Sequence, residues 1–100
     1  MSKEYASALF SLAREAHVED EILDELKVVA KLMEDNPEIL EFLAAPNISK
    51  RERCGALKKA LDGQVHEYVL SFLQLLCDRE RIRLLGECAE EFAAMLDEEK

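Results

Sequence analysis

The chain has 100 residues and a formal net charge of −9, from 22 acidic and 13 basic side chains. This length fits one domain, and so acidic a chain repels phosphate backbones and anionic lipid headgroups unless its basic residues gather in one place. With only 3 Gly and 2 Pro, the composition argues against disorder and against a turn-rich β-sandwich.

Apolar residues recur at spacings of three and four along most of the chain, which is typical of amphipathic helices. No segment alternates as a strand would, and the joints between the periodic segments are short. We therefore predict an all-α fold, a compact bundle of about six helices in a single domain over residues 1–100. The predicted helices cover residues 3–17, 20–34, 37–44, 50–61, 64–79 and 85–98.

Residues with defined roles at helix ends support these boundaries. Ser2 and Asn36 are predicted N-caps, the latter directly before a proline. Ser49 and Glu52 have the spacing of a capping box, in which each side chain satisfies a backbone N–H of the other residue. Gly63 is placed to end the fourth helix.

The segment from Tyr68 to Cys77 is the most apolar part of the chain. Its polar positions, Ser71 and Gln74, fall on one narrow strip, so about 300° of a helix here is apolar. A helix of this kind must be buried from several sides. The first predicted helix is apolar over about 200°, and we expect the first and fifth helices to be central.

Four short amphipathic helices are too few to cover both of these helices completely. If their uncovered faces lie side by side, they form a groove able to accept an amphipathic helix from another chain. The other interpretation is that both faces are simply core, and composition alone does not decide between the two. The candidate groove residues are Tyr5, Ala8 and Leu12 on the first helix, and Tyr68, Phe72 and Leu75 on the fifth.

No pattern of catalytic or metal-binding residues is found. Neither His17 nor His66 has the Glu three residues before it that di-metal helix bundles use. The odd number of cysteines, Cys54, Cys77 and Cys88, matches no metal or redox spacing, and each lies among apolar positions where a free thiol packs as a small hydrophobe. A Cys–His pair stays open on sequence alone, although no local signature supports it. We expect no enzyme activity, no metal site and no cofactor.

A basic segment suggests an alternative function. Residues 50–59 carry five basic side chains and one acidic one. A free-standing helical regulatory or nucleic-acid-binding module could use this Lys50–Lys59 patch. Against it, no predicted helix presents a basic face suited to base edges, and no aromatic residue lies beside the patch for stacking.

Several segments together resemble the N-terminal domain of the delta subunit of bacterial F-type ATP synthases, whose mitochondrial relative is the oligomycin-sensitivity-conferring protein. The resemblance covers essentially the whole chain, and the order and spacing of its parts are specific. It is carried by Tyr5–Phe10, by Pro46–Lys50, by Phe72 and Leu73 leading to Arg81–Leu85, and by Glu90–Phe92.

The resemblance implies a non-catalytic six-helix bundle in the peripheral stalk, or stator, of a proton-translocating ATP synthase. In that family a groove between the first and fifth helices takes the N-terminal helix of the α subunit, which helps to hold the catalytic head against rotor torque during ATP synthesis. By position, Tyr5, Ala8 and Leu75 correspond to this groove, whereas Leu12, Tyr68 and Phe72 come from the face argument. The implied location is peripheral, on the cytoplasmic face of the bacterial inner membrane.

Two departures from the family pattern bear on these expectations. Family members continue into a second, C-terminal domain that contacts the b subunits of the stalk, and we expect this chain to comprise the N-terminal domain alone. We therefore expect weak or absent b-subunit binding. Gly86 stands where family sequences often have proline, in the first turn of the last predicted helix.

Overall fold

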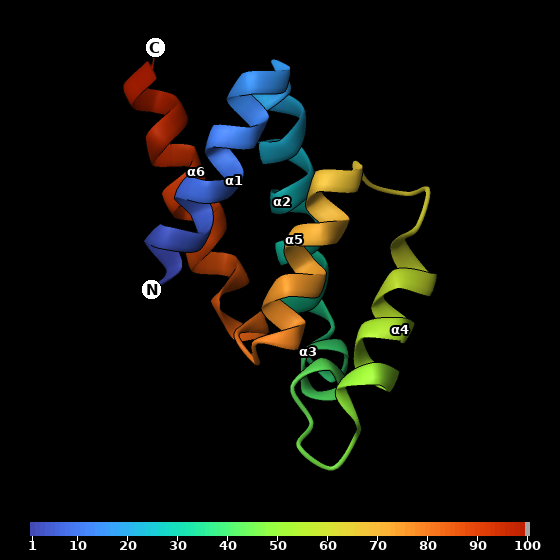
Figure 1. Ribbon diagram of the computed structural model, residues 1–100. Helices are drawn as coiled ribbons and strands as arrows, with labels where there is room; N and C mark the ends of the chain where they lie inside the picture. The colour runs from blue at the N-terminus through green and yellow to red at the C-terminus, as the bar shows by residue number, and fades with distance from the viewer. Residues whose placement is uncertain (100) are drawn as a thin grey trace.

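The computed structural model describes residues 1–99 of the chain. Over these residues it contains helices joined by short loops and no strand, as predicted (Figure 1). The elements in chain order are α1 (Ser2–Ala16), α2 (Glu19–Asp35), α3 (Pro37–Leu43), α4 (Lys50–Leu61), α5 (Glu67–Asp78), the 3₁₀ turn η1 (Ile82–Leu84) and α6 (Leu85–Glu99).

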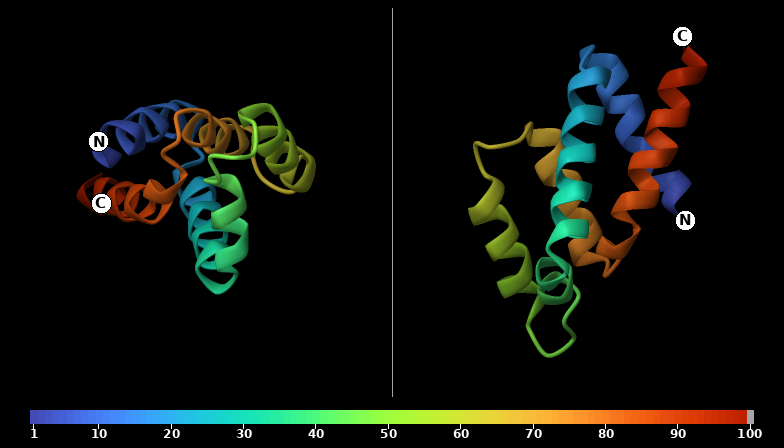
Figure 2. Two further views of the ribbon diagram at one scale, coloured as in Figure 1. Left: turned by 90° about the horizontal axis from the view of Figure 1, so that it is seen from below. Right: turned by 180° about the vertical axis from the view of Figure 1, so that it is seen from behind.

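The helices form a bundle whose two sides differ. Helices α1 and α6 lie side by side at one side, and α4 packs against α5 at the other (Figures 1 and 2). Helix α2 runs along the back between them and contacts α1, α3, α5 and α6 (Figure 2). The structure therefore does not confirm that the first and fifth helices alone are central.

The core joins residues from every α-helix. On α1 the buried positions are Ala6, Leu9, Phe10 and Ala13, which repeat at three and four residues. Phe10 meets Phe92 of α6 edge to face, with ring centroids 5.2 Å apart. Helix α5 is heavily buried, as predicted, through Val69, Phe72, Leu73, Leu76 and Cys77.

Helix α5 begins three residues later than predicted, because His66 caps it. The ring Nδ1 of His66 accepts a hydrogen bond from the backbone N–H of Tyr68 at 3.0 Å. The backbone N–H of His66 in turn donates to the carboxylate of Glu25 on α2, at 2.6 Å. A partner 41 residues away in the sequence thus helps to set this helix start.

The predicted caps have mixed outcomes. Ser49 accepts a hydrogen bond from the backbone N–H of Glu52 at 3.2 Å, as its half of a capping box requires. Ser2 is wrong as an N-cap, since it is the first helical residue. Asn36 stands at the N-cap position of α3, but its side chain donates to the carbonyl of Leu32 at the end of α2 instead.

Gly63 follows the end of α4 with a φ of 79°, a left-handed conformation that glycine adopts at little cost. The connection over residues 79–83 is charged at four of its five positions, a composition that predicts an exposed polar loop. It contains Ile82, which is 1% exposed and joins the core.

Leu57 and Ala60 are three residues apart, which predicts that both lie on the buried face of α4. Ala60 is instead exposed, whereas Arg53 is only 3% exposed. The Arg53 guanidinium can be buried because each of its nitrogens has an acceptor. Nε donates to the Ile48 carbonyl at 2.9 Å, Nη1 to the Leu43 carbonyl at 3.2 Å, and Nη2 pairs with Glu80 at 3.5 Å. This side chain ties the α3–α4 loop to the turn after α5.

We predict that Arg53→Ala lowers the free energy of unfolding by about 2–4 kcal/mol, because it leaves buried carbonyls without a donor and opens a cavity. Arg51→Ala is the matched control: it removes the same side chain from an exposed position of the same helix. Urea unfolding followed by circular dichroism measures both. Equal stability of the two variants would contradict a structural role for Arg53.

Candidate functional site

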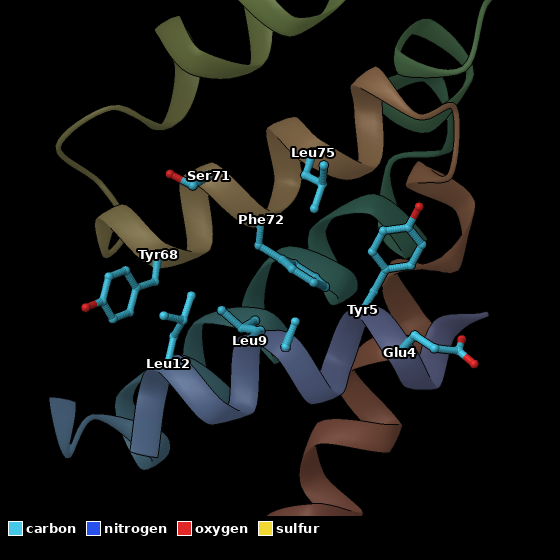
Figure 3. A pocket seen from close by; sticks show the side chains of 9 residues that line it. Glu4, Tyr5, Leu9, Leu12, Tyr68, Ser71, Phe72 and Leu75 are labelled. Carbon is cyan, nitrogen blue, oxygen red and sulfur yellow. The ribbon is translucent and has the colours of Figure 1, made fainter. Parts of the chain in front are cut away.

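An apolar groove of about 490 Å³ lies between α1 and α5 (Figure 3). Its lining comes from these two helices only, and most of it is hydrocarbon or aromatic ring. The lining residues are Glu4, Tyr5, Ala8, Leu9, Leu12, Tyr68, Ser71, Phe72 and Leu75.

The groove follows from how the apolar face of α1 is divided. Its buried stripe, which includes Ala6 and Phe10, packs into the core, where Phe10 meets α6. Tyr5, Ala8 and Leu12 follow the neighbouring edge at spacings of three and four, so they point towards α5. The direct contact between α1 and α5 is limited, and the space between them stays open.

The groove has a buried floor and exposed walls. Leu9 is 3% exposed and Phe72 is 6% exposed, so both belong to the core as well as to the groove. Figure 3 shows Phe72 reaching from α5 towards α1. Leu12 and Leu75 are 47% and 41% exposed and stand on opposite sides, so both walls of the groove offer apolar surface to a partner.

The two tyrosines mark the two ends of the groove. Tyr68 lies near Leu12 at one end, and Tyr5 lies across from Leu75 towards the other (Figure 3). Both rings are half-buried. At the Tyr5 end the terminal ammonium of Met1 pairs with Glu4 at 3.0 Å, and this pairing lowers the pKa of the Glu4 carboxyl.

All six candidate residues from the sequence line this one groove. The structure thus brings them together, while what the groove binds stays a prediction. Three further residues line the groove but are not among the six candidates predicted from the sequence: Leu9, Glu4 and Ser71. Leu9 lies inside the broad apolar face already recognised on α1. Glu4 lies four residues before Ala8, and Ser71 lies three after Tyr68 and four before Leu75, so helical geometry could have placed both on the rim.

The described residues form no cluster of metal-ligating side chains, and two of the three cysteines are buried. Across residues 1–99 no three His, Cys, Asp or Glu side chains are grouped closely enough to hold a metal ion. The Cys77 thiol donates to the Leu43 carbonyl at 3.8 Å, and the Cys88 thiol donates to the Ser2 carbonyl at 3.6 Å. Burial raises the pKa of Cys77 to about 11, and that of Cys88 to about 11 as well. Both thiols are therefore protonated at neutral pH and are poor nucleophiles.

The Lys50–Lys59 patch is smaller than the sequence indicates. Arg53 is buried and its donors are used inside the domain, so it contributes nothing to a binding surface. The four remaining basic side chains of the patch, Lys50, Arg51, Lys58 and Lys59, are exposed on α4.

Within residues 1–99, no helix is both long enough and apolar enough to span a bilayer.

Fold and groove together define an all-α domain with an open apolar groove between two of its helices. Over residues 1–100 the chain matches the family model of the ATP synthase delta (OSCP) subunit. The chain belongs to this family, which confirms the resemblance inferred from the sequence.

Individual relatives agree with this assignment. The chain is 38% identical over 100 residues to the ATP synthase subunit delta of Bacillus thuringiensis (strain Al Hakam), and equally to those of Bacillus cereus (strain AH820) and Bacillus anthracis (strain CDC 684 / NRRL 3495). Each alignment covers 100% of this chain and 55% of the relative. The chain thus spans about half the length of these relatives.

We predict that alkaline pH destabilises the domain through its buried thiols. The folded-state pKa of Cys77 and of Cys88 is about 11, against an ordinary value of 9.0, so the folded chain binds more protons than the unfolded chain between these values. The stabilisation is complete below pH 9 and is lost as the pH rises through 11.

The test compares the wild type with the double variant Cys77→Ala, Cys88→Ala. Free energies of unfolding are measured from about pH 8 to about pH 11. The wild type should lose more stability over this range than the variant, in which no buried thiol can ionise. Parallel curves for the two proteins would contradict the assignment to the thiols.

Proposed function

We propose that this chain is a non-catalytic part of the peripheral stalk of an F-type ATP synthase, and that its groove binds the N-terminal helix of the α subunit. Membership of the delta (OSCP) family supports the first part. The second part rests on a single observation: an apolar groove between α1 and α5 that is lined by the residues expected to bind a foreign helix.

The dimensions of the groove suit a helix. Leu12 lies seven positions after Tyr5 on α1, and Leu75 lies seven positions after Tyr68 on α5. Each pair therefore spans about 10 Å, or two turns, along its helix axis. A helix in this groove would present apolar side chains at i, i+3 or i+4, and i+7. Ala8 leaves room for the partner backbone to approach α1 closely.

Binding would be driven by burial of apolar surface that is now exposed. Leu12 and Leu75 are nearly half exposed, and both would be covered by a helix lying over Phe72. Apolar burial contributes about 25 cal/mol per Å², from which the ordering of the partner helix must be subtracted. The affinity therefore depends strongly on how well a few side chains fill the groove.

In this proposal the domain serves as a rigid anchor. The groove floor is part of the packed core, so a force on the bound helix is transmitted to α2 and α6 rather than to a loop. Holding the catalytic head against rotor torque needs such a connection and needs no chemistry. The chain would be peripheral, on the cytoplasmic face of the bacterial inner membrane, and contacts with b subunits would belong to the half of the relatives that this chain does not span.

We predict that Ala8→Arg weakens binding of the α-subunit N-terminal helix by about 2–3 kcal/mol, because a charged side chain would occupy the space that the partner backbone needs. The measurement is calorimetric titration of the domain with a synthetic peptide of the α-subunit N-terminus. Ala60→Arg is the matched control, since it makes the same change at an exposed position of α4.

Circular dichroism should show the same helicity for both variants and for the wild type. If Ala8→Arg binds the peptide as tightly as Ala60→Arg does, the groove is not the binding site. If the wild type does not bind the peptide at all, the α-subunit helix is not the partner.

A further inference from the structure

The groove is continuous at its Tyr5 end with a shallow hollow in which positive charge gathers. The two share Tyr5 and Glu4 as lining residues. The hollow is lined by Met1, Glu4, Tyr5, Arg79 and Arg81. None of the residues that line the groove itself is basic, whereas two of the five that line the hollow are arginines.

The turn after α5 places the two arginines. Arg79 caps the helix, and its backbone N–H donates to the carbonyl of Leu75 at 3.0 Å. Glu80 has a left-handed φ of 59° and reverses the chain direction, and the backbone N–H of Arg81 then donates to the carbonyl of Leu76 at 2.7 Å. Arg79 and Arg81 thus both reach the hollow, on either side of Glu80.

The same turn directs the carboxylate of Glu80, which stands between the two arginines in the sequence, away from the hollow. Glu80 does not line the hollow and pairs with the buried Arg53 at 3.5 Å. Glu4 is paired with the ammonium group of Met1 at 3.0 Å. Within residues 1–99 neither Arg79 nor Arg81 forms a salt bridge, although the chain carries a net charge of −9.

We propose that Arg79 and Arg81 bind a carboxylate of the helix that occupies the groove, and so fix the direction and register of that helix. This inference rests on the proposed function. Because Arg79 lies four residues, or one turn, beyond Leu75, the carboxylate lies about one turn beyond the last apolar contact of the partner helix. An apolar groove alone accepts a helix in either direction, whereas a charge at one end distinguishes the two.

Both arginines are exposed, so their effect on affinity is moderate and depends on salt. We expect the double variant Arg79→Gln, Arg81→Gln to bind the α-subunit N-terminal peptide about three- to fivefold more weakly at low ionic strength, chiefly through slower association. The difference should shrink as salt is added. The matched control is Arg51→Gln, Lys58→Gln, which removes the same charge from exposed positions on α4.

A peptide series locates the carboxylate. Each Asp or Glu of the peptide is replaced in turn by Asn or Gln, and each peptide is titrated into the wild type and into the arginine double variant. One replacement should weaken binding to the wild type and leave binding to the double variant unchanged, which is the signature of a direct pair. That position should lie near one end of the apolar stripe of the peptide.

The outcomes separate this inference from the proposed function. If the peptide binds but no acidic position couples to the arginines, or if the control variant loses as much affinity, the inference is wrong and the groove assignment stands. If the wild type does not bind the peptide, both fail together. If sedimentation shows a dimer of the domain that Leu75→Arg abolishes, a second copy occupies the groove and the inference is overturned.

Discussion

The packing of α1 against α6 is the constraint on which the rest of the structure depends. Phe10 and Phe92 meet edge to face at its centre, and Ala6 and Ala13 are small enough for close approach. At one end of the pair Arg14 bonds Glu99 and lies over the Phe10 ring. Since α1 is held to α6 in this way, only one edge of its apolar face remains for α5, and that edge does not close the gap. The groove is therefore a product of the core rather than a separate feature.

Much of the fold could be predicted because helical periodicity reports which side of each helix is buried. The six helices were predicted within a few residues, and Ser49 caps α4 as its spacing indicates. Two of the errors come from contacts made outside the helix concerned. His66 starts α5 with help from Glu25 of α2, and Arg53 is buried because the carbonyls of Leu43 and Ile48 accept hydrogen bonds from its guanidinium. Local sequence contains no sign of either contact.

The groove residues could be predicted from an excess of apolar surface, whereas its surroundings could not. Tyr5 and Leu75 stand out because the helices that carry them have wider apolar faces than their neighbours can cover. The position of Arg79 and Arg81 beside that groove depends on the left-handed conformation of Glu80, a residue type that gives little warning of such a turn. In the sequence, Arg79 and Arg81 belong to a polar connection between two helices, and nothing there indicates that they lie beside the groove.

The double role of Leu9 and Phe72, which belong both to the core and to the groove floor, links occupancy to folding. A ligand that binds only the folded chain raises the free energy of unfolding by RT ln(1 + [L]/Kd), or about 2.7 kcal/mol at a hundredfold excess over Kd. If a partner helix occupies the groove as proposed, empty copies unfold more often than filled ones and are degraded first, since proteases act on the unfolded chain. The cellular amount of such a domain would follow the supply of its partner, so that unassembled subunits do not accumulate.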